Sequence, residues 1–247
     1  MSHSRQGPSL YQRQFSPRID TDINANADQV RALVVSPHPD DDVIAMGGTI
    51  AKLIAGGHRV CSVYVTNGGG SLRTLNISDQ KIVRIRRREA RKAALAVLRM
   101  SKVYFLQPIH VTQREFDDAN VLRARVKLRR IMLQEKPTRI YLPHPREAHL
   151  THRRTTELVT EVLESMKGLN PDVWGYEVWT PIERPDLVVD ITQFSEKKGM
   201  AIQVHRTQLG EKAYDEAVLG LNRYRAAFLD PYQPENSRYV EAFVRVR

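Results

Sequence analysis

The sequence predicts an α/β protein, a three-layer α/β/α sandwich built on a mostly parallel sheet. Short apolar runs rich in β-branched residues alternate with longer amphipathic stretches along the chain. This alternation is typical of parallel strands that are joined by crossover helices. The chain has 247 residues, which is within the range of one large α/β domain, so no second domain is required.

The strands of this sheet are predicted at the short apolar runs. The first run, residues 32–36, contains Ala-Leu-Val-Val followed by serine, as expected for a buried parallel strand. Further strands are predicted at residues 60–66, 103–106, 139–142, 173–179 and 187–189. A shorter segment ends the chain at residues 244–247.

The helices are predicted in the stretches between these strands. The first covers residues 42–55, because Gly56 and Gly57 directly after it favour a helix end. The second, residues 79–100, begins with a dense group of arginines and directs its alanines toward the core. Further helices are predicted at residues 119–134, 152–167, 192–204 and 211–228.

The first 27 residues differ in character from the rest of the chain. They are mostly polar, contain Pro8 and Pro17, and show neither strand nor helix periodicity. We therefore expect an N-terminal arm over residues 1–27 and a single domain over residues 28–247. The aromatic side chains of the arm, Tyr11 and Phe15, could contact the domain or a second subunit of a homo-oligomer.

The composition restricts the class of protein. A single cysteine, Cys61, excludes a disulfide framework and a cysteine-based zinc cluster. No apolar run approaches the roughly 20 residues of a membrane span, and the amino terminus lacks a signal-peptide core, so we expect a cytoplasmic protein. The formal charge of +10 favours acidic partners such as nucleic acid, anionic lipid or a phosphorylated substrate.

A histidine and three aspartates follow the first predicted strand in the stretch SPHPDDDVIAMGGT, residues 36–49. Ligands bind at the carboxyl ends of strands in open α/β sheets, so this turn is the first candidate site. His38 and Asp41 are three residues apart, and a tight turn can bring both onto one ion. Nitrogen and oxygen ligands together suit Zn²⁺. The alternative is that the aspartates only cap the following helix.

A second group of histidines follows the predicted strand at residues 139–142. The stretch PHPREAHLTH, residues 143–152, contains three histidines in nine positions. If the two strands are neighbours in the sheet, both turns face one pocket. One of these histidines, at position 144, 149 or 152, is then available as a third ligand beside His38 and Asp41.

At these residues the sequence resembles the LmbE-like/PIG-L family of zinc-dependent de-N-acetylases. SPHPDDDVIAMGGTI matches the family's HPDD motif with its Gly-Gly-Thr helix, and residues 149–152, His-Leu-Thr-His, match its HPDH motif. Weaker similarity continues through residues 87–94, 189–208 and 239–243, so that the resemblance covers residues 30–245. It implies a Rossmann-like sandwich, the LmbE-like deacetylase fold.

The resemblance also implies a mechanism and a set of residues. His38, Asp41 and His152 would hold Zn²⁺, for which Fe²⁺, Mn²⁺ or Co²⁺ could substitute. Asp40 would be the general base and His149 would stabilise the developing oxyanion. One arginine of the second helix, best aligned as Arg87, would bind the substrate. The region around Tyr176, Glu177 and Trp179 would face it.

Two positions depart from the family pattern. Thr151 replaces the aspartate of HPDH, which orients and helps to charge the histidine at position 149. Either Glu147 substitutes for that aspartate or His149 acts mostly as a neutral imidazole. Asp42 replaces the usual glutamate after HPDD, a milder change because either acid suits the first turn of a helix.

The function expected from this resemblance is removal of an N-acetyl group from an N-acetylglucosamine-type sugar or sugar conjugate. The basic composition mildly favours an anionic substrate. One alternative keeps the metal site and hydrolyses another amide or a carbamoyl group. A different class, a basic nucleic-acid-binding protein, is disfavoured because the arginine-rich stretches at 84–91 and 123–130 lack interleaved aromatic residues.

Overall fold

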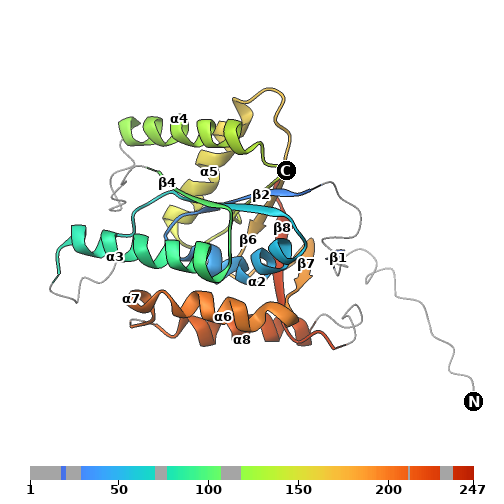
Figure 1. The fold of residues 1–247 in the computed structure, drawn as a ribbon. Helices are drawn as coiled ribbons and strands as arrows, with labels where there is room; N and C mark the ends of the chain where they lie inside the picture. The colour runs from blue at the N-terminus through green and yellow to red at the C-terminus, as the bar shows by residue number, and fades with distance from the viewer. Residues whose placement is uncertain (1–17, 21–28, 70–76, 107–117, 211, 229–235) are drawn as a thin grey trace, which may run out of the picture.

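The computed structural model describes residues 18–20, 29–69, 77–106, 118–210, 212–228 and 236–247. Within them an eight-stranded sheet runs in the order β1-β7-β8-β6-β5-β2-β3-β4. Neighbouring strands are parallel except at β8, which is antiparallel to β6 and β7. Figure 1 shows helices on both faces of this sheet. The predicted three-layer α/β/α sandwich with a mostly parallel sheet is therefore confirmed.

Apart from β1, which lies in the expected arm, the observed strands lie close to the predicted ones. They are β1 (Arg18–Asp20), β2 (Arg31–Ser36), β3 (Arg59–Tyr64), β4 (Lys102–Phe105), β5 (Arg139–Pro143), β6 (Asp172–Tyr176), β7 (Leu187–Asp190) and β8 (Val240–Arg245). The last of these starts before the predicted terminal segment, because its residues pair along β7 from Val240 onward.

The described helices also follow the prediction, with one internal change and one short helix, α7, that was not predicted. They are α2 (Asp41–Ala55), α3 (Asp79–Arg91), η1 (Lys92–Val97), α4 (Asp118–Glu135), α5 (Leu150–Glu164), η2 (Thr192–Phe194), α6 (Ser195–Gln203), α7 (Arg206–Leu209) and α8 (Tyr214–Ala227). The helix predicted at 79–100 is thus divided, since the α-helix widens into the π-helix η1 after Arg91. Arg99, with φ of 65°, then lies in the left-handed region beyond the helix.

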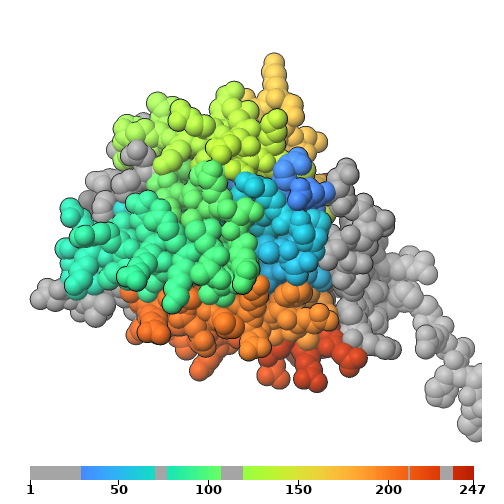
Figure 2. Space-filling model, in the orientation of Figure 1, coloured from blue at the N-terminus to red at the C-terminus, as the bar shows by residue number. Residues whose placement is uncertain are grey.

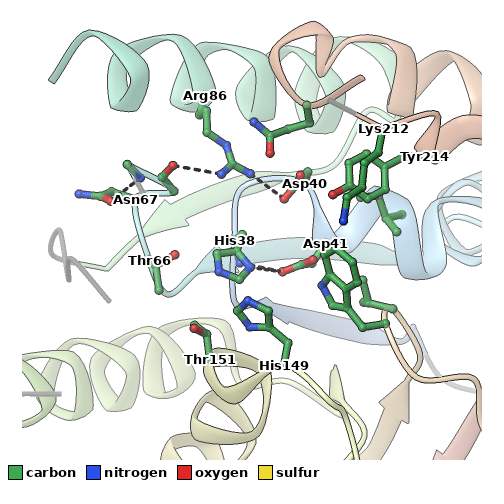
Figure 3. Close-up of a pocket in the computed structure, with 16 residues that line it drawn as sticks. His38, Asp40, Asp41, Thr66, Asn67, Arg86, His149, Thr151, Lys212 and Tyr214 are labelled. Atoms are coloured by element: carbon green, nitrogen blue, oxygen red, sulfur yellow. Dashed lines mark hydrogen bonds and ion pairs between the residues drawn. The ribbon is translucent and has the colours of Figure 1, made fainter. Parts of the chain in front are cut away.

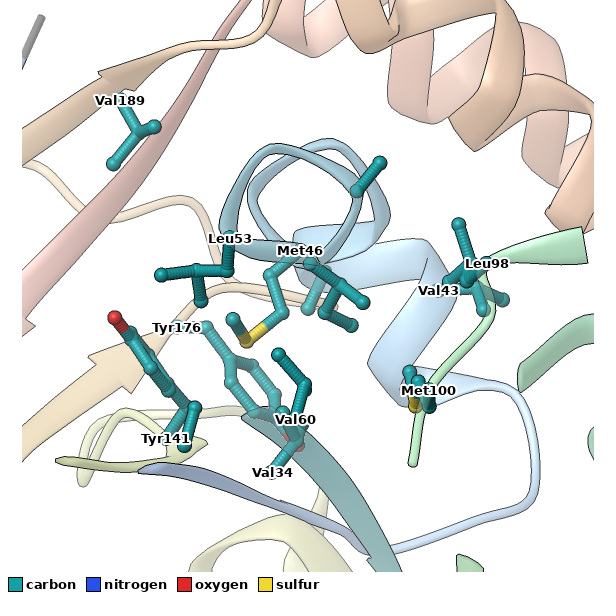
Figure 4. Close-up of a cluster of buried hydrophobic side chains, with 14 of the residues drawn as sticks. Val34, Val43, Met46, Leu53, Val60, Leu98, Met100, Tyr141, Tyr176 and Val189 are labelled. Atoms are coloured by element: carbon teal, nitrogen blue, oxygen red, sulfur yellow. The ribbon is translucent and has the colours of Figure 1, made fainter. Parts of the chain in front are cut away.

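Two hydrophobic cores cover the two faces of the sheet. Along β2, Ala32 and Val34 belong to one core and Leu33 and Val35 to the other, as the two-residue period of a strand requires. The first core packs beneath α2 and α6 and includes the cluster drawn in Figure 4. The second packs beneath α4 and α5. In Figure 2 the C-terminal helices and α4 form opposite outer layers.

Part of the expected N-terminal arm contributes to the sheet. Arg18–Asp20 form the edge strand β1, parallel to β7, and the other residues of the range 1–27 lie outside the described part of the chain. The division into an arm and one domain stays a prediction. Within the described residues, no helix combines the length and the apolar character needed to cross a membrane.

Helix α2 bends directly after the turn that carries the first motif. Met46 has φ of −141°, so the regular helix is interrupted, and beyond the bend Glu241 of β8 accepts the backbone N–H groups of Gly48 and Thr49. Lys198 neutralises this buried carboxylate at 2.8 Å. A Cβ atom on Gly48 would lie 2.6 Å from Ile191, so only glycine permits this approach. The part of α2 beyond the bend is therefore held in place by β8 and by Ile191, the residue after β7.

Candidate metal centre and active site

The two sequence motifs meet at the carboxyl ends of two adjacent strands. β2 and β5 are hydrogen-bonded neighbours, with Val34 opposite Tyr141, and each motif follows its strand directly. Their turns line a pocket of about 310 Å³, at the lower end of the range for ligand sites. Figure 3 shows side chains from both turns pointing into this pocket.

His38, Asp41 and His152 converge on one point. Their candidate ligand atoms all lie within 4.8 Å of one another. His38 Nδ1 is 3.0 Å from Asp41 Oδ2, and His152 Nε2 approaches the same oxygen at 3.3 Å. His38 comes from the turn after β2, Asp41 opens α2, and His152 lies in the first turn of α5.

The chemistry of this group fits a divalent cation. Burial opposes ionisation of Asp41, yet the two imidazoles hold the pKa of its carboxyl well below the usual range. Despite its burial, His152 has a pKa raised to about 9 by Asp41 and Glu147. Neither ring nitrogen of His152 makes an aligned hydrogen bond within the described residues. Two imidazoles and one carboxylate around such a position are a donor set that suits Zn²⁺.

Glu147 contacts this group through the His152 ring, on the side away from Asp41. Its side chain is fully buried, and Oε2 lies 3.4 Å from His152 Nδ1, the nitrogen that faces away from Asp41. The backbone N–H groups of Val178 and Thr180 donate to Oε1 at 2.8 and 3.1 Å. Against the effect of burial, these contacts and His152 lower the pKa of the Glu147 carboxyl. A carboxylate behind a histidine ligand fixes its ring orientation and its tautomer.

Asp40 lies beside His38, Asp41 and His152, which we call the metal group, but its ion pair is with an arginine. Arg86 donates to Asp40 Oδ1 at 2.9 Å, and both side chains are almost completely buried. Burial raises the pKa of the Asp40 carboxyl, and the Arg86 guanidinium opposes that rise. Arg86 also donates to the carbonyl of Gly68, which has φ of +68° and no room for a Cβ beside the guanidinium. Asp40 is thus held at the pocket wall by a fixed cation.

The arginine of α3 that lines the pocket is not the predicted one. Arg86 lines the pocket, whereas the guanidinium of Arg87 lies 4.6 Å from the centre of the Phe105 ring. Successive helical residues are about 100° apart around the axis, so neighbouring arginines cannot share one face. The spacing of Arg86 from the buried Ile82 and Ala90, four residues on either side, could have identified it from the sequence.

His149 lies next to the metal group, and its imidazole is neutral at pH 7. Its ring centre lies 5.1 Å from that of His38 and 4.9 Å from that of His152. Burial, followed by these two histidines, lowers the pKa of His149 to about 4. Glu147 does not take the place of the family aspartate beside His149, because its contacts go to His152 instead. Of the two alternatives for Thr151, the structure favours the neutral imidazole.

Asp42 is a structural residue rather than a pocket residue. It is completely buried and accepts hydrogen bonds from Ser62 at 2.8 Å and Tyr64 at 2.7 Å, both in β3. Its burial raises the pKa of the carboxyl to about 6 despite these donors. Asp42 therefore joins the start of α2 to the neighbouring strand.

Of the three residues expected near the substrate at the end of β6 and beyond it, Trp179 alone lines the pocket. The Tyr176 side chain is buried and donates to Val35 in the sheet, while Glu177 pairs with Arg225. The sequence reasoning did not single out other residues of the pocket wall, which come from α7, from the connection to α8 and from the start of α8. They are Gln208, Lys212 and Tyr214. The first of them falls within the weakly similar stretch 189–208, and no motif marks the other two.

Comparison with known proteins places this site in a family. Diacetylchitobiose deacetylase of Thermococcus kodakarensis is 26% identical over 216 residues, 80% of this chain and 78% of that protein. A probable N-acetyl-alpha-D-glucosaminyl L-malate deacetylase 2 of Bacillus cereus is 27% identical over 187 residues, 71% of this chain and 82% of that protein. The solved structure of N,N'-diacetylchitobiose deacetylase from Pyrococcus horikoshii matches with a TM-score of 0.71 and 29% identity, covering 87% of this chain and 82% of the other.

The family model described as PIG-L, GlcNAc-PI de-N-acetylase, matches residues 33–163, more than half of the chain. The matched range begins in β2 and ends in α5, so it contains both turns that form the pocket. The chain belongs to the PIG-L family.

Proposed function

We propose that this protein is a metal-dependent hydrolase, with Zn²⁺ as the expected cation, that removes the N-acetyl group from an N-acetylglucosamine-type sugar or sugar conjugate. The observation that carries the proposal is the convergence of His38, Asp41 and His152 beside a separate carboxylate, Asp40. Membership of the PIG-L family and similarity to two kinds of sugar deacetylase support it.

The roles of the residues follow from their positions. His38, Asp41 and His152 would hold the cation, which supplies a Lewis acid and makes water a better nucleophile at neutral pH. Asp40 takes the proton from the attacking water and returns it to the departing amine. His149, on the other side of the metal group, donates a hydrogen bond to the oxygen of the acetamide as negative charge develops there.

Arg86 has a positioning role in this mechanism. Its hydrogen bonds to Asp40 and to the carbonyl of Gly68 fix the carboxylate against the pocket wall. A fixed general base avoids the cost of reorientation during the reaction. Arg86 therefore replaces Arg87 in the proposal, and its contact with the substrate is indirect, through Asp40.

The test combines metal analysis with measurement of acetate released from a panel of N-acetylated sugars. The zinc-loaded wild type should release acetate, and Asp40→Asn should lower turnover by about 10²–10⁴-fold without loss of zinc. Asp172→Asn, which changes an exposed carboxylate of β6, is the matched control. Full activity of Asp40→Asn, or a product other than acetate from every amide tested, would contradict the proposal.

A further inference from the structure

Trp179 extends the pocket wall outward from the reacting centre. Its indole is stacked with the His149 imidazole, with ring centres 6.1 Å apart and planes inclined by 21°. The backbone N–H of Trp179 donates to Glu147 at 2.9 Å, so the same carboxylate that supports His152 also fixes this residue. Trp179 nevertheless keeps 43% of its surface exposed. A rigid, exposed indole beside a catalytic group is a surface on which a sugar ring can pack.

Lys212 and Tyr214 border the same indole. Lys212 Nζ lies 4.4 Å from the centre of the Trp179 ring, and Tyr214 meets that ring edge-on at 6.2 Å. In Figure 3 the two side chains lie next to each other on the side of the pocket formed by the C-terminal helices. Contact of the ammonium with the indole face keeps it at the pocket wall.

The charge balance of the pocket distinguishes Lys212 from the other charged residues. The carboxylates and cations that line the pocket are Asp40, Asp41, Arg86 and Lys212. Arg86 is paired with Asp40, and Asp41 faces the two histidines. Within the described part of the chain, no carboxylate lies within 4.0 Å of the Lys212 ammonium. The backbone of Lys212 is fixed by its N–H, which donates to the carbonyl of Gln208. Lys212 is therefore a cation of the pocket wall that is available to a ligand.

We propose that Trp179, Lys212 and Tyr214 form a subsite for an anionic group, a phosphate or a carboxylate, attached to the N-acetylated sugar. The inference rests on the proposed function and specifies its substrate class. The sugar packs on the indole while its acetamide reaches Asp40 and His149, and the anion meets the Lys212 ammonium. A neutral aglycone would leave that ammonium without a charged partner. Similarity to the diacetylchitobiose deacetylase and to the N-acetylglucosaminyl malate deacetylase does not distinguish an anionic from a neutral substrate, whereas Lys212 does.

The experiment measures acetate release by the zinc-loaded enzyme from three substrates. They are N-acetylglucosamine 1-phosphate, the carboxymethyl glycoside of N-acetylglucosamine and its neutral methyl glycoside. Wild type should show a kcat/KM ratio of anionic to neutral substrate of about 10 or more, and Lys212→Gln should lower that ratio about tenfold, mainly through KM. The control Lys167→Gln removes an exposed lysine after α5 and should keep the wild-type ratio.

Comparison of the phosphate and carboxylate substrates identifies which anion the subsite prefers. An equal kcat/KM of wild type for charged and neutral substrates, or an unchanged ratio in Lys212→Gln, would overturn the subsite. Release of no acetate from any substrate would instead refute the proposed function. In that case calorimetry with N-acetylglucosamine 1-phosphate decides. Binding that Lys212→Gln weakens about tenfold supports the subsite, and equal binding by both proteins overturns it.

Discussion

Replacement of Glu147 by glutamine tests how the metal-binding histidine is held. Glutamine has the shape of glutamate, so its oxygen can still accept the backbone N–H groups of Val178 and Thr180, now 2.8 and 3.1 Å from Oε1. Its NH₂ group then occupies the position of Oε2, 3.4 Å from His152 Nδ1. Two donors would face each other there, which favours transfer of the ring proton to Nε2. A protonated Nε2 cannot bind a cation.

The expected effect is a loss of zinc affinity of about 10–100-fold, the usual range for a carboxylate behind a histidine ligand. This range corresponds to about 1.4–2.7 kcal/mol. It is smaller than the effect of removing a ligand, because the opposite tautomer costs free energy without abolishing the site. The same substitution removes a buried negative charge, so the local attraction for any divalent cation falls as well.

The affinity is measured by competition with a chelator of known zinc affinity, and thermal unfolding of the metal-free protein checks that the variant folds. Glu161→Gln is the matched control, because Glu161 is an acid of α5, the helix that carries His152, and its side chain is 48% exposed. Its zinc affinity should equal that of wild type. If Glu147→Gln binds zinc as tightly as Glu161→Gln in a protein that melts normally, the orienting role of Glu147 is wrong.

Three further predictions follow from the same site and from the single cysteine. His149→Ala should retain zinc but lose about 10²–10³-fold in kcat, as for loss of one oxyanion donor; wild-type turnover would contradict this. Arg86→Met should lower both activity and melting temperature, because Asp40 is left buried without its cation, whereas Arg87→Met should leave activity near wild type; equal effects of the pair would contradict the assignment. Cys61, 2% exposed and with a thiol pKa raised to about 11 by burial, should resist thiol reagents at pH 8 until the protein is denatured; rapid labelling of the native protein would refute its inert environment.

The sheet and the position of the site could be predicted from local sequence. The apolar runs ending at Ser36 and at Leu142 are strands whose period and flanking turns are visible in the chain. A polar motif after each run indicates the carboxyl edge of a parallel sheet. Strands of this kind are buried on both faces, so polar side chains that bind or react with a ligand are exposed only at their ends. His38 and Asp41 could therefore be named as candidate metal ligands before their distances were known, and the family resemblance added His152.

The orientation of individual side chains required the tertiary structure. The spacing of Arg86 from Ile82 and Ala90 is a signal in the sequence, but the packing of these two residues in the fold decides that this face of α3 lines the pocket. Likewise, Glu147 turns toward His152 and away from His149 because the backbone after β6 supplies N–H donors to its carboxylate. Such contacts join residues far apart in the chain, and no local pattern records them.

What the sequence by itself determined was the succession of the strands from β2 onward and of the longer helices along the chain, together with residues able to bind a cation, since both depend on local periodicity and on residue chemistry. What only the tertiary structure decided was which side chains share the pocket. Lys212 illustrates this, because it carries no motif and lies over Trp179 only when α8 packs against the sheet. Long-range packing sets these neighbours, and it is a property of the whole fold rather than of any one segment.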